Sequence, residues 1–406
     1  MSSEWKPPTE LPDLRNVSVV AFDSEEKDDG INADLGSAWP WGGGYVCGVS
    51  VAWRANGTVQ SLYAPLAHPD SQNFDREQVQ CWLRDLFMSS TRIITQNGLF
   101  DYGWLSAEFG IAMPPAERLE EIGALASTVD ENRTSYKLHD LCKWRGLPGK
   151  DERLLLEGCN ALGLIPKGRK KFNPQAHIWR LPARFVGPYA ETDAANTLLL
   201  FESLDPMLDQ EKTRGPYRLE VELMPMVHAM RKRGIRVDTA RAEEVRDLML
   251  AKRDAALKQL SEKHGADISM TVVRSGNQLA KICDELGISY PRTSKGNPSF
   301  SAGMSGWMDK SDHWLPPLVD RARKYDNSAK FVENTIDHVK NGRVHGEIHP
   351  HHGDVGGSRT SRFSYSHPAL QQTPKHNEEL APLIRALYLP EEGEVWASLR
   401  PQPARI

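Results

Sequence analysis

The stretch Val-Ser-Val-Val-Ala-Phe-Asp-Ser-Glu at residues 17–25 most constrains what this chain of 406 residues can fold into. Its apolar, mostly β-branched residues predict a buried strand. Successive side chains of a strand alternate between its faces, so Asp23 and Glu25 should point the same way, with Ser24 opposite. Two carboxylates on one face at the end of a buried strand repel each other, and a divalent cation relieves that repulsion. The stretch therefore predicts the first half of a metal site.

The Asp-x-Glu spacing carries little weight by itself. Two further copies occur in the chain, at residues 75–77 and 209–211. The first resembles a helix start and the second lies in a polar turn, so neither follows an apolar strand. The metal-site hypothesis therefore needs partners elsewhere in the sequence.

Composition limits the classes of protein that the chain can belong to. Its length suffices for two domains with separate cores. A net charge of −4 with 26% charged residues excludes binding of polyanions through bulk charge, so any contact with nucleic acid must come from local basic surface. Five scattered cysteines without a Cys-x-x-Cys pair favour a reducing compartment such as the cytoplasm and argue against structural zinc. The polar, proline-rich start is not a signal peptide, and no apolar run is long enough to span a membrane.

The elements after residue 44 predict a mixed α/β sheet. Residues 45–54 and 58–63 alternate as strands do, and Asn56-Gly57 between them tolerates the positive φ of a tight hairpin. An amphipathic helix is expected over 75–87 and a short strand over 92–95. The order strand, hairpin, helix, strand is typical of a mixed sheet flanked by helices.

A second acidic motif follows the strand at 92–95. In Gln-Asn-Gly-Leu-Phe-Asp, residues 96–101, Asp101 lies where the strand passes into an apolar helix expected over 102–109. Polar side chains at such a junction gather at the carboxyl end of a sheet. A helix-capping role is the alternative for this aspartate.

A third motif is Tyr189-Ala-Glu-Thr-Asp193, within a helix expected over 188–204. Tyr189 and Asp193 are four residues apart and therefore share one helix face. A phenol one turn from a carboxylate can orient a water molecule bound to a metal. An ordinary helical face is the alternative, because Tyr136 and Asp140 have the same spacing.

Taken in order, these three motifs resemble the proofreading 3′–5′ exonuclease domain of family A DNA polymerases, in the tyrosine-bearing branch of the DEDD superfamily. The segments 134–141 and 181–193 also resemble phage-type members. The resemblance covers roughly residues 14–205 and implies a ribonuclease H-like mixed sheet with flanking helices.

The resemblance also implies a chemistry. Two Mg²⁺ or Mn²⁺ ions would be bound by four carboxylates and would hydrolyse the terminal phosphodiester at a DNA 3′ end, releasing nucleoside 5′-monophosphates. Tyr189 would orient the attacking water, and Asn97 and Phe100 would shape the pocket for the terminal nucleotide. The four carboxylates are Asp23, Glu25, Asp101 and Asp193.

The second half resembles the opening of the family A polymerase domain. Residues 218–238 read as an apolar-periodic helix stopped by glycine and followed by a short extended piece. The long charged helix expected over 240–264 corresponds to the thumb in that family, although any antiparallel helical pair fits the same pattern. Asn277 and Lys330 match positions that track the DNA backbone. Asp326 stands one turn before Lys330, where the family commonly has arginine.

Residues 356–374 resemble the polymerase stretch T-G-R-x-S-S-x-x-P-N-L-Q-N-I-P. The resemblance places Thr360, Arg362 and Gln371 on the DNA, with Arg362 and Gln371 in the primer–template minor groove, whose acceptors are nearly independent of sequence. Ser361 and Ala369 depart from the usual Gly and Asn.

Just before this stretch, histidines gather near Asp354, and a polar loop is favoured over a metal site because no acidic or cysteine partner has ligand spacing. These histidines are His345, His349, His351 and His352.

The family pattern ends at residue 399. Where a polymerase has its first catalytic aspartate, the sequence reads Arg-Pro-Gln-Pro-Ala-Arg-Ile, residues 400–406. We therefore expect an exonuclease domain over 1–205 and a partial polymerase domain over 206–406, with a mainly helical thumb, an incomplete palm and no polymerase activity. Three alternatives stay open: the N-terminal half of a split polymerase completed by a separate C-terminal chain, a non-catalytic DNA-binding fragment, and an exonuclease that trims RNA.

Overall fold

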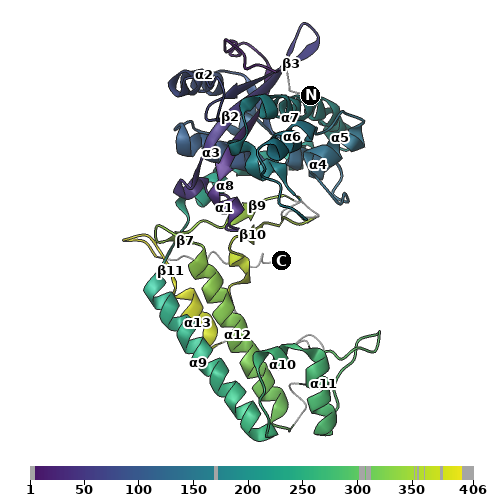
Figure 1. The fold of residues 1–406 in the computed structure, drawn as a ribbon, viewed down its shortest axis with the longest axis vertical. Helices are drawn as coiled ribbons and strands as arrows, with labels where there is room; N and C mark the ends of the chain where they lie inside the picture. The colour runs from purple at the N-terminus through teal and green to yellow at the C-terminus, as the bar shows by residue number, and fades with distance from the viewer. Residues whose placement is uncertain are drawn as a thin grey trace, which may run out of the picture. The chain divides into compact units, whose positions relative to one another are not determined.

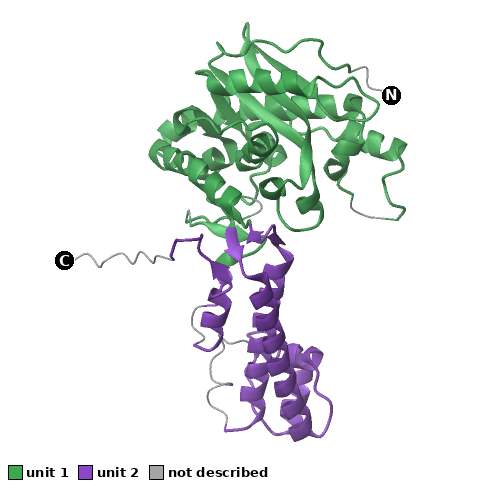
Figure 2. Ribbon diagram, turned by 90° about the vertical axis from the view of Figure 1, so that its left-hand side faces the viewer, with its two compact units in different colours: residues 1–234, 345–371 green, residues 235–344, 372–406 purple. Residues whose placement is uncertain are grey.

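The computed structural model describes residues 5–168, 172–300, 307, 312–351, 353, 356–360, 362–374 and 378–395. The chain divides into two compact units, drawn in different colours in Figure 2. The first comprises residues 1–234 and 345–371, and the second comprises 235–344 and 372–406. The boundary expected at residue 205 falls inside helix α7 (Ala183–Gln210). Ser361, His352, Asp354 and the tail at 400–406, which the sequence singled out, lie outside the described residues.

A five-stranded mixed sheet forms the centre of the first unit, in the order β3-β2-β1-β4-β5. Strand β1 runs antiparallel to β2 and parallel to β4. The expectation of a mixed α/β fold is thereby confirmed. The strands are β1 (Val19–Asp28), β2 (Gly44–Ala55), β3 (Thr58–Pro65), β4 (Arg92–Thr95) and β5 (Leu119–Glu121).

Local sequence signals set the hairpin and its neighbours. Asn56 and Gly57 join β2 to β3 with φ angles of 50° and 80°, the left-handed region that the Asn-Gly pair favours. Helix α2 (Arg76–Met88) begins after Asp75, whose side chain accepts a hydrogen bond from the Gln78 backbone N–H. The expected hairpin, helix and strand 92–95 are confirmed.

Helices α2 and α3 (Gly98–Glu108) lie on one side of these strands, and α4 to α7 lie on the other (Figure 1). Phe22 of β1 packs edge-on against Phe87 of α2 at 5.3 Å between ring centroids, and Phe87 in turn packs against Tyr102 of α3. Helix α7 packs across β1, β2 and β3. The remaining helices of that side are α4 (Ile122–Val129), α5 (Leu138–Arg145) and α6 (Arg153–Ala161).

Trp39, in a short helical turn after β1, fixes the position of α3. Its ring is buried and stacks on His228 of α8 (Arg214–Arg233), with ring centroids 4.9 Å apart and planes 3° apart. The ring also lies against Gly103 of α3, where a Cβ atom would come within 2.4 Å of it. The close approach of α3 to Trp39 therefore requires glycine at position 103.

The segment 345–371 joins the first unit through a partly buried ion pair. Strands β9 (Glu347–His349) and β10 (Ser364–Ser366) pair with each other. Glu347 accepts hydrogen bonds from the backbone N–H and the hydroxyl of Ser37, and it lies 3.4 Å from the buried Arg231 guanidinium.

The second unit is mainly helical. Helix α9 (Thr239–His264), which confirms the charged helix expected over 240–264, packs along α12 (Leu315–Asp337). A small sheet has the order β11-β6-β8-β7. Its strands are β6 (Ile235–Val237), β7 (Val339–Lys340), β8 (Arg343–Val344) and β11 (Tyr388–Leu389), and the other helices are α10 (Met270–Arg274), α11 (Gly276–Glu285) and α13 (Leu380–Arg385). Among the described residues, no helix has the length and apolar character needed to cross a bilayer.

We expect Gly103→Ala to lower the free energy of unfolding by about 1–3 kcal/mol, because the added methyl group overlaps the Trp39 ring in a packed core. Gly215→Ala is the matched control, since it places the same methyl group in open space within α8. Urea unfolding followed by circular dichroism measures both variants. Equal stability of the two would contradict the packing argument.

Candidate active site

Asp101 lies beside the middle of β1 because β4 ends early. The pairing of β1 with β4 stops at Ala21 and Ile94, and the chain then turns at Asn97, whose φ is 65°, into α3. The Asp101 carboxylate accepts hydrogen bonds from the Ser24 backbone N–H at 3.0 Å and the Ser24 hydroxyl at 2.6 Å. The Asp101 carboxylate thus binds the β1 backbone just beyond the last residue that pairs with β4, at an edge that β4 leaves open.

Asp101, Glu25 and Asp193 lie close enough to Asp23 for their charges to act on it. Burial, followed by the charges of Asp101, Glu25 and Asp193, raises the pKa of Asp23 well above its usual value. Burial and the charge of Asp193 raise the pKa of Glu25 to about 8, and burial raises that of Asp101 to about 7. The structure thus brings together the four carboxylates that the sequence predicted, from β1, α3 and α7.

Tyr189 and Asp193 lie one turn apart on α7, as the spacing predicted, and both are buried. The connection between α5 and α6 brings Lys150 to them. Its ammonium lies 2.6 Å from Asp193 Oδ2 and 2.9 Å from the Tyr189 hydroxyl oxygen. Burial lowers the pKa of this lysine, but the charge and hydrogen bond of Asp193 and the charges of Asp23 and Glu25 together outweigh burial, so the pKa lies above its usual value.

Gln175 completes the hydrogen bonding of the phenol. Its side-chain amide donates to the Tyr189 oxygen and to Glu152 Oε1, both at 3.0 Å. The Tyr189 oxygen therefore accepts two hydrogen bonds, which fix its position. Burial and the charge of Asp193 raise the pKa of Tyr189 well above its usual value, so the phenol keeps its proton at neutral pH.

Sequence reasoning missed Lys150, Gln175 and Glu26. Glu26 follows the predicted Asp-x-Glu pair directly, and burial together with the Asp101 charge raises its pKa. Glycines at 146 and 149 show that the chain turns near Lys150, but no spacing connects Lys150 or Gln175 with α7. Only the folded chain brings them to the carboxylates.

The donor atoms fit a hard divalent cation. All four carboxylates offer oxygen ligands, which Mg²⁺ and Mn²⁺ prefer. Asp193 Oδ1 is buried and has no hydrogen-bond partner among the described residues. Within that same part of the chain, no three His, Cys, Asp or Glu side chains have the arrangement of metal ligands.

Asn97 and Phe100 lie at the start of α3, next to Asp101. Asn97 is exposed and its backbone N–H donates to Glu121 Oε1, while Phe100 is half-buried. The buried Glu121 also accepts from the Ala124 backbone N–H and so fixes the turn that precedes Asp101.

The candidate DNA contacts of the second half are all exposed: Asn277, Lys330, Thr360, Arg362 and Gln371. The Lys330 ammonium lies 3.5 Å from Asp326, a buried carboxylate of α12 that also pairs with Arg274 and lies 3.6 Å from Arg253. Burial raises the pKa of Asp326, but the Arg274 and Lys330 charges bring it below its usual value. Asp326 therefore gathers three cations around one buried charge.

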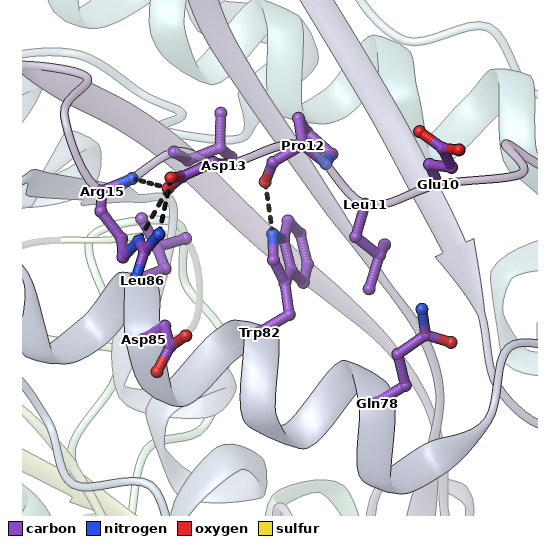
Figure 3. Close-up of a pocket in the computed structure, with 10 residues that line it drawn as sticks. Glu10, Leu11, Pro12, Asp13, Arg15, Gln78, Trp82, Asp85 and Leu86 are labelled. Carbon is purple, nitrogen blue, oxygen red and sulfur yellow. Dashed lines mark hydrogen bonds and ion pairs between the residues drawn. The ribbon is translucent and has the colours of Figure 1, made fainter.

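A cavity of about 420 Å³ lies between the N-terminal segment and α2 (Figure 3). Its most prominent contact is the hydrogen bond from the Trp82 indole to the Pro12 carbonyl, at 2.8 Å. None of the four carboxylates lines it, so this cavity is separate from the candidate site.

The chain is similar in sequence to polymerases of phages and bacteria, although no family model matches it. It is 30% identical over 413 residues to the DNA-directed DNA polymerase of Pseudomonas phage M6, covering 98% of this chain and 59% of the relative. It is 27% identical to DNA polymerase DpoZ of Vibrio phage phiVC8, covering 82% of this chain and 55% of the relative. DNA polymerase I of Chloroflexus aurantiacus is 30% identical over 241 residues, which cover 57% of this chain and 24% of that protein. The chain spans 55% to 60% of the lengths of the phage relatives.

One solved structure with a similar fold is the POL domain of Pol1 from M. smegmatis in complex with a DNA primer-template and dNTP. The TM-score is 0.68 at 15% sequence identity, and the match covers 93% of this chain and 55% of that one. At this identity the likeness shows the fold alone.

The raised carboxyl pKa values predict how stability depends on pH in the presence of a chelator. Glu25 titrates near pH 4 when unfolded, so its contribution to stability is lost as the pH rises through its folded pKa of about 8. We expect Glu25→Gln, which cannot ionise, to be more stable than the wild type at about pH 9 by up to ~5 kcal/mol, and to keep only about a third of this advantage at about pH 5.5.

Urea unfolding at the two pH values measures this difference. Glu131→Gln is the control, because Glu131 is an exposed carboxylate in a turn. If the unfolding free energies of the wild type and of Glu25→Gln depended on pH in the same way, the raised pKa would not belong to Glu25.

Proposed function

Because this chain belongs to the family A DNA polymerases, we propose that its first unit is a metal-dependent 3′–5′ exonuclease of the proofreading type. The observation that carries the proposal is the meeting of Asp23, Glu25, Asp101 and Asp193 at one end of the sheet, with Tyr189 beside Asp193. The proposed fold of this unit is ribonuclease H-like, and its proposed products are nucleoside 5′-monophosphates.

The four carboxylates would bind two divalent cations. Such ions supply a hydroxide nucleophile and stabilise the oxygen that leaves in phosphodiester hydrolysis. The protein contributes the low-dielectric surroundings, since three of the four carboxylates are buried and therefore gain strongly when a cation binds them. Binding of the cations would release the protons that the raised pKa values retain.

Tyr189 would orient the attacking water. Its raised pKa argues against a general base, because the phenolate is scarce at neutral pH. Its oxygen accepts hydrogen bonds from Lys150 and Gln175, which hold the phenol one helix turn from Asp193. A positioning role for Tyr189 follows from that geometry.

Asn97 and Phe100 would bind the terminal nucleotide. Phe100 offers an aromatic face that is partly accessible, and stacking on such a face tolerates any base. Asn97 offers an exposed amide at the same turn. A site of this kind accepts any 3′-terminal nucleotide, as proofreading requires.

We also propose that the second half binds DNA, which the basic group around Asp326 supports. Lys330 and Asn277 would contact the backbone of a duplex, and Thr360, Arg362 and Gln371 would contact the primer–template. Such contacts belong equally to an exonuclease, to one part of a polymerase, and to a DNA-binding fragment. Nuclease activity that depends on the four carboxylates distinguishes an exonuclease from a DNA-binding fragment.

We expect Asp23→Asn and Asp193→Asn each to lower exonuclease activity by roughly a hundredfold or more, because each removes a ligand charge from the site. The assay uses a 5′-labelled primer annealed to a longer template, with Mg²⁺ and without dNTPs, and measures shortening of the primer. Asp140→Asn is the matched control, since Tyr136 and Asp140 repeat the spacing of Tyr189 and Asp193 away from the carboxylates.

Near-normal activity of either site variant would contradict the proposal. Tight binding of the primer–template by the wild type without any shortening would favour the DNA-binding fragment instead. Extension of the primer when dNTPs are added would show polymerase activity in the same chain.

A further inference from the structure

Lys150 stands apart from the other residues of the candidate site because it is a cation among carboxylates. Its side chain is 23% exposed, and its ammonium contacts Asp193 Oδ2 and the Tyr189 hydroxyl at 2.6 and 2.9 Å. The ammonium also lies 5.2 Å from the centre of the Tyr189 ring. Three separate contacts thus hold one amine on the face of α7 that carries both functional side chains.

The charge of Lys150 also acts on the two carboxylates of β1. It lowers the pKa of Asp23 and that of Glu25, which burial and the neighbouring acids raise. The charge of the ammonium therefore acts on three of the four proposed metal ligands, and it contacts one of them, Asp193, directly. A divalent cation bound by the same carboxylates would meet a like charge within a few ångströms.

We propose that Lys150 is a built-in counter-ion that holds Asp193 and Tyr189 in position and that leaves Asp193 when a divalent cation binds. This inference rests on the proposed function, because it assumes that the carboxylates bind metal. The present arrangement supports an exchange, since the ammonium lies 2.6 Å from Asp193 Oδ2, one of the proposed ligand oxygens. Lys150 is a positioning residue in this proposal.

The connection that carries Lys150 is suited to such a movement. It links α5 to α6 over residues 146–152, and glycines with φ of 69° and 77° occupy positions 146 and 149. The amine contacts both Asp193 and Tyr189 through their side chains. It can therefore leave Asp193 by rotating its own flexible side chain, without unfolding a helix.

Calorimetric titration with Mn²⁺ tests the competition without any measurement of activity. We expect Lys150→Met to bind Mn²⁺ about tenfold more tightly than the wild type, because the competing charge is gone. Lys150→Arg, which keeps the charge, should stay within about threefold of the wild type. Lys143→Met is the matched control, since it removes an exposed lysine of α5, and its affinity should equal that of the wild type.

A second experiment follows the amine itself. Acetylation by an amine-reactive ester, read peptide by peptide in a mass spectrometer, should be slow at Lys150 with a chelator present and faster at saturating Mg²⁺. Lys143 provides the internal reference, because its rate should not change. An unchanged or slower rate at Lys150 with Mg²⁺ would overturn the release of the amine from Asp193.

The two experiments separate the failure of this inference from the failure of the proposed function. If the wild type and Lys150→Met both fail to bind Mn²⁺, the carboxylates are not a metal site and the proposed function fails. If both bind Mn²⁺ with equal affinity, the metal site stands and the counter-ion role of Lys150 is wrong. Weaker binding by Lys150→Met would equally overturn it, because the lysine would then support the metal.

Discussion

The repulsion among buried carboxylates at one end of the sheet is the constraint on which the first unit depends. Four acidic groups lie where water is largely excluded, and each raises the free energy of its neighbours' ionised forms. Hydrogen-bond donors partly compensate this repulsion. Ser24 donates to Asp101, and the Lys150 ammonium pairs with Asp193. The packing of α3 and α7 against β1 holds these groups together despite the repulsion.

A second buried carboxylate of the first unit shows how a structural acid differs from this group. Glu347 is largely buried, yet Arg231, Ser37 and His367 surround it and bring its pKa below its usual value. The carboxylates around Asp23 have fewer donors than they need, and their pKa values rise. An acid that is buried and left short of donors is typical of functional sites, whereas a fully paired one stabilises a contact.

The sequence predicted the parts of the fold that local signals determine. The Asn56-Gly57 hairpin, the strand 92–95 and the helix after Asp75 depend on residues within a few positions of each other, and the structure has all three. The places of the four carboxylates and Tyr189 on a strand or a helix could also be predicted, whereas their roles stay predictions. The grouping of residues 345–371 with the first unit could not, since it depends on the contact of Glu347 with Ser37 and Arg231, distant in sequence.

Lys150 and Gln175 show why the other residues of the candidate site could not be predicted from the sequence. Both lie in connections before α7, whose course follows from tertiary packing and not from periodicity, and neither has a fixed spacing to Asp193. Yet both bind the phenol that the helix pattern did predict. Hydrophobic periodicity and residue spacing therefore predict which side chains share a face of a strand or helix. They do not predict the groups that compensate a buried charge, because these can lie in any segment that the fold brings nearby. A buried carboxylate without enough donors indicates that such a group is nearby, and for Asp193 that group is the Lys150 amine.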